Sequence, residues 1–345
     1  MLKSFIIMLC FTAACSSQIT QVDKVFKEKK ELLNEDNYVL DSIYKIGDSR
    51  RYGVYPDSIN NKLHPKTGKS LIQSLLDLTE KNSLTINFVK GYYGLNLIFD
   101  SRKNITLHFD EAEFNLLHIT NENGEQSTNI NLKGSLILFD QLGTYHSNNI
   151  KIDSVTIKSN TEKSLSKSKS RGCHIYKGTD NLHIKYLKVE DLVSGSIKHQ
   201  NNHAALAIDG LRENPTNITI DEVYIDSSDR HGAYITGSNN VFKKIVINKY
   251  AQGTTEFMSG MQDSVNGEER VLSGLWVNRC NNCIFNEVII YTKNSKSAMP
   301  LKLDEGIIRE PTFINILKLD VPYKDDLVLD DLFTNILVKK IIQID

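Results

Sequence analysis

Three basic residues recur at equivalent positions in the central part of the chain. Arg171, His203 and Arg230 each lie seven residues before a glycine that follows a short apolar stretch. Equivalent residues of neighbouring parallel strands lie about 4.8 Å apart. If the three stretches are such strands, the spacing predicts a column of basic side chains. The alternation of side chains along a strand places this column on the outer face.

Polar and aromatic residues are expected beside this basic column. Counting by twos along the strands places four of them on the same face: Lys177, Asp209, Tyr234 and Trp276. The alternate positions are expected in the core: Tyr176, Leu206, Ile208 and Ile235. Asp229 and His231 adjoin Arg230, and Lys198 lies on an insertion shortly before His203. Arginine binds carboxylate or sulfate groups in a bidentate manner, so a basic and aromatic cleft predicts binding of an anionic polysaccharide.

One class of reaction uses the basic residues directly. β-Elimination or C5-epimerisation of a uronate needs a base that removes the proton next to the carboxylate, and a cation that neutralises the developing charge. His203 or His231 is the candidate base, because histidine titrates near neutral pH. Arg171 and Arg230 are the candidate cations. The predicted function is therefore a polysaccharide lyase or a related epimerase.

Two alternatives remain open. Glycoside hydrolysis needs a pair of carboxyl groups, about 5 to 9.5 Å apart. The candidates for that pair are Asp209, Asp226, Asp229 and Glu256. A non-catalytic glycan-binding protein needs the same cleft without a working base.

A recurring signature indicates which elements position these residues. Asparagine followed by alternating apolar residues occurs at Asn104, Asn129, Asn149, Asn181, Asn217, Asn240 and Asn282. Such alternation, repeated every few tens of residues, is typical of a β-solenoid, whose units must stack to bury their apolar faces. Asparagine tolerates a positive φ and hydrogen-bonds through its side-chain amide. We therefore expect buried asparagine side chains stacked at successive corners.

The segment before the repeat has the features of a cap. Residues 67–80 carry apolar residues at helical spacing, and the strand of residues 84–91 contains Phe88-Val-Lys-Gly91-Tyr-Tyr. This order resembles the pectate-lyase-like right-handed parallel β-helix superfamily over about residues 66–300. The resemblance implies an all-β, right-handed parallel β-helix (solenoid) with an N-terminal capping helix. It also implies polysaccharide lyase or glycoside hydrolase activity.

Two further expectations depend on this resemblance. Lyases of the superfamily often use Ca²⁺, which makes Ca²⁺ the candidate cofactor, although no dense cluster of acids marks a site. Polygalacturonases share the fold, and His231-Gly232 resembles part of their Gly-His-Gly strand. Their paired aspartates would fall near Asn202-His203, where the chain has no carboxylate, and their Arg-Ile-Lys motif is absent. Polygalacturonase activity is therefore not expected.

The first residues have the character of a targeting segment. One lysine precedes a short apolar run, and Thr-Ala-Ala-Cys15 resembles a bacterial lipoprotein lipobox. The resemblance implies cleavage before Cys15 and lipidation of its thiol; a plain secretory signal is the alternative. It places the protein in the bacterial cell envelope, anchored at the outer membrane or facing the periplasm. The expected organisation is a signal peptide (1–14), a tether and irregular segment (15–65) and a β-helix domain (66–345, clearest coils 91–295).

The composition limits the kinds of binding partner that are expected. A net charge of −1 at pH 7 provides no basic surface for nucleic acid. Cys280-Asn-Asn-Cys283 has the spacing of half a zinc site, but no second pair follows. Structural packing is the prediction for these cysteines, with a local disulfide as the alternative. The expected partners are an anionic polysaccharide or oligosaccharide and the membrane, through the lipid, and the protein is expected to be a monomer.

Overall fold

The computed structural model describes residues 32–158, 172–190, 204–252, 272–304, 310–324, 328–330 and 335–345. Two 3-10 helices, η1 (Glu35–Asn37) and η2 (Ser49–Tyr52), precede the helix α1 (Leu71–Asn82). Within these ranges, no helix combines the length and the apolar character needed to cross a membrane.

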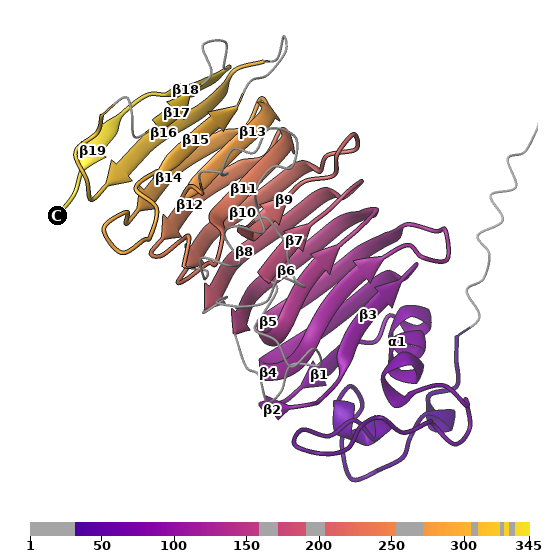
Figure 1. The fold of residues 1–345 in the computed structure, drawn as a ribbon. Helices are drawn as coiled ribbons and strands as arrows, with labels where there is room; N and C mark the ends of the chain where they lie inside the picture. Colours follow the sequence, from indigo (N-terminus) through magenta and orange to yellow (C-terminus); the bar gives the residue numbers. More distant parts are fainter. Residues whose placement is uncertain are drawn as a thin grey trace, which may run out of the picture. The chain divides into compact units, whose positions relative to one another are not determined.

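Helix α1 lies where the apolar spacing predicted a helix. The hydroxyl of Ser70 accepts a hydrogen bond from the backbone N–H of Gln73 at 3.3 Å and caps the first turn. One face of the helix is buried: Leu71, Ile72, Leu75, Leu76 and Leu78. Figure 1 shows α1 beside the first strands of the sheet. The predicted helix is confirmed.

The other described elements are strands. They are β1 (Ile86–Phe88), β2 (Gly91–Tyr92), β3 (Asn96–Asp100), β4 (Lys103–Thr120), β5 (Ser127–Thr144), β6 (Ser147–Lys158), β7 (Gly172–Ile175), β8 (Asp180–Glu190), β9 (Ala204–Ile208), β10 (Thr216–Ile225), β11 (His231–Ser238), β12 (Val241–Ile247), β13 (Leu275–Asn281), β14 (Ile284–Ile290), β15 (Leu301–Asp304), β16 (Thr312–Leu319), β17 (Val328–Asp330), β18 (Ile336–Val338) and β19 (Ile341–Gln343). One series of parallel pairs joins β6, β8, β10, β12, β14 and β16. A second joins β7, β9, β11, β13, β15 and β17. Consecutive members of each series lie side by side in Figure 1.

The predicted fold class, an open right-handed parallel β-helix, is wrong. The protein is mostly β, with 54% strand and 7% helix, and has a closed seven-strand parallel β-barrel with extra strands outside it. The pairings close in the order β5, β6, β8, β10, β11, β9, β7 and back to β5. Strand β5 is long enough to pair with both β6 and β7, and Thr216 of β10 pairs with Ser238 of β11. A repeated sequence pattern predicts that parallel strands pair, but it does not determine which pairs close a ring.

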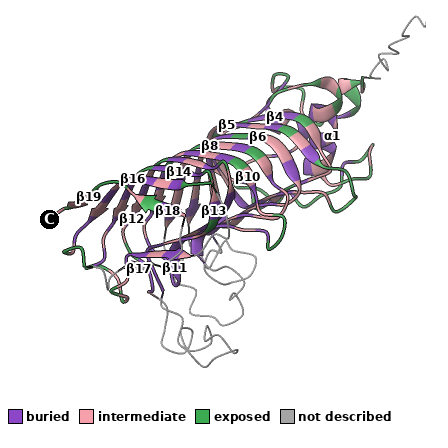
Figure 2. Ribbon diagram, turned by 90° about the horizontal axis from the view of Figure 1, so that it is seen from above, coloured by how far each residue is buried: buried purple, intermediate pink, exposed green. Residues whose placement is uncertain are grey.

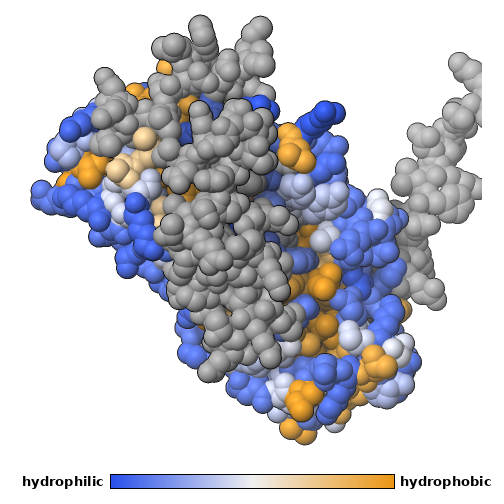
Figure 3. Space-filling view, viewed as in Figure 1, coloured by the Kyte–Doolittle hydropathy of each residue, from blue (hydrophilic) through white to orange (hydrophobic). Residues whose placement is uncertain are grey.

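The core is formed by the inward positions of the strands. Leu206, Ile208 and Ile235 are fully buried, as predicted. Figure 2 shows buried and more exposed positions alternating along the strands. The surface in Figure 3 is largely hydrophilic, with apolar residues at the lower end, where Figure 1 draws the segment before α1. Cys173, Cys280 and Cys283 are buried in this core, and none of the three forms a disulfide.

The asparagine signature marks turns with a positive φ, as predicted. Six of the seven asparagines have a φ between 52° and 58°: Asn104, Asn129, Asn149, Asn181, Asn217 and Asn282. Amide bonds connect neighbouring turns, since Asn129 Nδ2 donates to Asn104 Oδ1 at 2.8 Å and Asn149 Nδ2 donates to Asn129 Oδ1 at 2.5 Å. These side chains are largely exposed, so the prediction of buried corners is wrong for them. Asn240 is the exception, because it is fully buried.

We expect Asn240 and Asn217 to differ in their contributions to stability. Asn240 Oδ1 accepts from the backbone N–H of Ile218 at 2.9 Å, and its Nδ2 donates to Thr236 O at 3.0 Å. Asn240→Ala would leave both buried backbone groups without their partner, at a cost of about 1–3 kcal/mol for each unsatisfied group. Asn217 bonds Asp180 at the exposed surface, so Asn217→Ala should cost less than about 1 kcal/mol. Urea unfolding of both variants checks this; equal losses would contradict it.

Candidate functional site

Four residues occupy equivalent positions on the outer face of β7, β9, β11 and β13. They are His174, Ala207, Tyr234 and Trp276. Each follows a buried core residue, because side chains alternate along a strand. Ala207, which is fully buried, separates His174 from Tyr234 along this row. Their backbones lie two strand spacings apart, about 9.6 Å.

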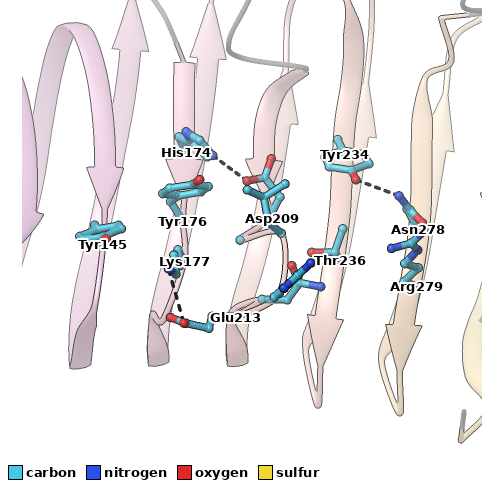
Figure 4. Close-up of a pocket in the computed structure, with 14 residues that line it drawn as sticks. Tyr145, His174, Tyr176, Lys177, Asp209, Glu213, Tyr234, Thr236, Asn278 and Arg279 are labelled. Carbon is cyan, nitrogen blue, oxygen red and sulfur yellow. Dashed lines mark hydrogen bonds and ion pairs between the residues drawn. The ribbon is translucent and has the colours of Figure 1, made fainter. Parts of the chain in front are cut away.

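His174 and Tyr234 line an open pocket with a volume of about 1140 Å³. Its lining residues come from β7, β11 and β13 and from the turns that follow β5, β7 and β9: Tyr145, His174, Tyr176, Lys177, Asp209, Gly210, Leu211, Arg212, Glu213, Asn214, Tyr234, Thr236, Asn278 and Arg279. Figure 4 shows their side chains arranged along one face of the strands. The lining combines aromatic rings, two carboxylates and several basic groups.

His174 and Asp209 form a hydrogen-bonded pair at the centre of the pocket. His174 Nε2 lies 3.1 Å from Asp209 Oδ1, and both side chains are partly exposed, at 20% and 15%. If Nε2 carries the proton, it donates to the carboxylate and Nδ1 is the basic nitrogen. A carboxylate partner of this kind fixes the tautomer and orientation of an imidazole. The pair therefore has the geometry of an oriented general base.

Tyr234 supplies a hydroxyl to the pocket. Its oxygen accepts a hydrogen bond from Asn278 Nδ2 at 2.8 Å, and Figure 4 shows this contact. Burial raises the pKa of the Tyr234 hydroxyl to about 12. The hydroxyl consequently keeps its proton at neutral pH and can act as a proton donor.

Charged groups surround this centre. Glu213 lies 3.4 Å from Lys177 Nζ and 3.5 Å from His146 Nε2. Arg212 and Arg279 are exposed and line the pocket, and no ion pair is recorded for either within the described parts of the chain. Two guanidinium groups that face the same pocket can bind carboxylate groups of a ligand.

Aromatic rings provide a flat surface at one side of the pocket. Tyr145 and Tyr176 stack with centroids 5.8 Å apart and an interplanar angle of 24°. Trp276 is arranged differently, because Lys302 Nζ lies 3.9 Å from the centre of its ring and Tyr234 packs 4.6 Å away. Its indole N–H donates to Asp304 at 2.7 Å. Trp276 thus supports Tyr234 rather than offering an open face to a sugar.

The structure brings three of the predicted binding residues into this pocket: Lys177, Asp209 and Tyr234. Trp276 lies beside it. Tyr176, predicted for the core, instead lines the pocket. Arg171, Lys198, His203 and Glu256 lie outside the described residues, as does Cys15, so their predicted roles stay predictions.

The remaining predicted catalytic residues are not on the outer face. Asp229, Arg230 and His231 are 1%, 2% and 2% exposed. The turn before β11 folds inward, where the Ser228 hydroxyl donates to His231 O at 2.7 Å and Ala251 N donates to Arg230 O at 2.8 Å. Burial lowers the pKa of the Arg230 guanidinium to about 10. The prediction that Arg230 points outward is therefore wrong.

His231 is also a poor candidate for the base. Its Nδ1 accepts a hydrogen bond from the backbone N–H of Ser273 at 2.9 Å. A backbone N–H can only donate, so the proton of the neutral ring is on Nε2. The ring packs 4.9 Å from Trp276, inside the protein. His231 therefore contributes to packing beneath the site.

Several pocket residues were missed because the predicted strand alignment is shifted by one residue. Ile175 pairs with Ile208, although Ile175 lies three residues before Gly178 and Ile208 two before Gly210. A shift of one residue exchanges the two faces of a strand. Aligning the isoleucines Ile175, Ile208 and Ile235 would have placed His174 and Tyr176 outward. The turn residues Arg212 and Glu213 carried no sequence signal.

Metal ligands are not gathered in the described residues. No group of three or more His, Cys, Asp or Glu side chains there is placed to hold a metal ion. A Ca²⁺ ion typically takes six to eight oxygen ligands.

We expect Tyr234 to make the folded state less stable at high pH. Its pKa rises from 10.0 to about 12 on burial. Between these values the unfolded chain loses this proton while the folded chain keeps it. The stability that the protonated group contributes is present below pH 10 and is lost as the pH rises toward 12. Tyr234→Phe should reduce the fall in melting temperature across this interval; an equal fall in the variant and the wild type would contradict the expectation.

The chain was also compared with known proteins. No family model, no curated protein and no solved structure matches it.

Proposed function

We propose that the pocket binds an anionic, uronate-containing polysaccharide and that the protein cleaves it by β-elimination or epimerises it at C5. The observation that carries this proposal is the His174–Asp209 pair, 3.1 Å apart, in an open pocket with arginine and tyrosine side chains. The reaction needs a base, a cation for the carboxylate and a proton donor. The pocket offers one candidate for each role.

The roles follow from the geometry of the pocket. His174 removes the proton at C5, and Asp209 stabilises the resulting imidazolium. Arg279, with Arg212 and the Asn278 amide nearby, neutralises the sugar carboxylate as negative charge develops. In elimination, the electron pair from the C5–H bond forms the C4–C5 double bond and the C4–O bond breaks. Tyr234 then donates its proton to the leaving oxygen, and in epimerisation a proton is returned to the opposite face of C5.

Glycoside hydrolysis is a second candidate, because Asp209 and Glu213 line the same pocket. That reaction needs one carboxyl group as a proton donor. Each carboxylate here faces a basic side chain: Asp209 faces His174, and Glu213 faces Lys177 and His146. Both carboxylates are therefore already engaged by basic groups of the protein. The elimination or epimerisation is therefore preferred.

The proposal is tested with the purified full-length protein and a panel of polyuronates, sulfated glycans and neutral glycans. Absorbance of unsaturated uronate and release of reducing ends are measured on the same samples. New absorbance with new ends supports elimination. Exchange of the C5 proton with deuterated solvent, without new ends, supports epimerisation. New ends alone would show hydrolysis, and binding without any of these changes would show a glycan-binding protein; either result overturns the proposal.

A further inference from the structure

A second hollow lies on the outer face of β5, β6 and β8, which belong to a different series of paired strands from the pocket above. Its volume is about 240 Å³. Six polar side chains line it in two rows across the three strands: Asn131, Lys151 and His183, and Lys133, Asp153 and Lys185. The register pairs Asn131 with Lys151 and Lys151 with His183. Side chains of one row lie about 4.8 Å apart, so the three lysines surround a common space.

An irregularity in β5 shapes this hollow. The register between β5 and β6 shifts between Leu132 and Ser135, and Gly134 has a φ of 78°. A Cβ at Gly134 would lie 2.2 Å from Phe109 O, so only glycine fits there. Bulges redirect neighbouring side chains and are common at binding sites. This bulge is next to Lys133.

The carboxylate of Asp153 is engaged by groups of the protein itself and is not an acceptor for external cations. Gly134 N donates to Asp153 Oδ2 at 3.1 Å, and Lys185 Nζ lies 2.7 Å from Asp153 Oδ1. The ion pair with Lys185 lowers the pKa of Asp153 although its partial burial acts in the opposite direction. The carboxylate therefore balances Lys185 and fixes its ammonium group at the edge of the hollow.

Lys133 and Lys151 carry the remaining positive charge. Both are exposed, and the described part of the chain records no ion pair for either. The imidazole of His183 bonds Asp221 at 3.1 Å, and Asp221 also pairs with Lys243 at 2.9 Å, so that carboxylate is already engaged. Three ammonium groups against the single carboxylate of Asp153, beside an amide and an imidazole, favour an anion.

We propose that this hollow is a second anion-binding site, which binds one sulfate or carboxylate group of an anionic glycan. Its volume is below the range of about 300–1,000 Å³ that is usual for small-molecule pockets, so it accommodates a single charged group or sugar rather than a chain. The site is separate from the His174 pocket and does not depend on the reaction proposed there.

Calorimetric titration of the full-length protein with sodium sulfate, and separately with sodium glucuronate, tests the site. Ionic strength is kept constant with sodium chloride. The wild type should bind at least one of the two anions at a single site, and Lys133→Ala/Lys151→Ala should weaken this binding at least tenfold. Lys249→Ala/Lys340→Ala is the matched control, because it removes the same charge from two exposed lysines that do not line the hollow. The control should retain wild-type affinity.

Two further results complete the test. Arg212→Ala/Arg279→Ala, which removes the guanidinium groups of the first pocket, should retain the binding that Lys133→Ala/Lys151→Ala weakens, which separates this site from the first pocket. Equal weakening in both lysine variants would show attraction by net charge alone and would overturn the proposal. No binding of either anion by the wild type would overturn it as well.

Discussion

Replacing His174 with alanine should lower turnover on a uronate polysaccharide about 10²–10⁴-fold, which is the usual contribution of a positioned general base. His174 lies in the open pocket with Asp209 at 3.1 Å, so the substitution removes the base and leaves the carboxylate-binding groups in place. Steady-state kinetics should therefore show a loss in kcat with a small change in KM. Affinity for the polysaccharide, measured by calorimetry, should stay close to that of the wild type.

The chain contains a matched control for this experiment. His183 also lies 3.1 Å from an aspartate, Asp221, but it is on β8 and outside the first pocket. His183→Ala removes an equivalent histidine–aspartate pair without affecting the proposed reaction, so its turnover should equal that of the wild type. An active His174→Ala variant, or equal losses in both variants, would rule out His174 as the base.

Replacing Phe88 with alanine should destabilise the protein by about 3–5 kcal/mol, the usual cost of removing a fully buried phenylalanine side chain. Phe88 is 0% exposed and packs against Phe109 at 5.4 Å, Phe114 at 5.3 Å and Tyr93 at 5.3 Å. These rings join β1 and β4 to the segment between β2 and β3. Their loss would leave a cavity that the surrounding strands cannot easily fill.

Chemical unfolding measures this effect, with Leu337→Ala as the control, because Leu337 is 49% exposed and lies at the other end of the strand series, on β18. The control should change the free energy of unfolding by less than about 1 kcal/mol. A loss of less than about 1 kcal/mol in Phe88→Ala would show that the aromatic cluster is not a major source of stability.

Local patterns in the sequence determined several features directly. Alternating apolar residues predicted the strands, and helical spacing predicted α1. Asparagine at the turns predicted positive φ values, because its short polar side chain tolerates them. Counting by twos also placed Lys177, Asp209 and Tyr234 on the outer face, where they line the pocket. Each of these features depends on near neighbours in the chain, and such neighbours are visible in the sequence.

Only the tertiary structure decided the rest of the site. The pairing of Ile175 with Ile208 turned His174 and Tyr176 outward, and the sequence offered two alignments, on the glycines and on the isoleucines, that differ by one residue in this strand. Closure of the ring likewise depends on a tertiary contact, the pairing of Thr216 at the start of β10 with Ser238 at the end of β11. The burial of Asp229, Arg230 and His231 also depends on a tertiary contact, because Ala251 packs against their turn. Register, closure and burial are properties of segments that meet only in the folded chain, so a local pattern cannot determine them.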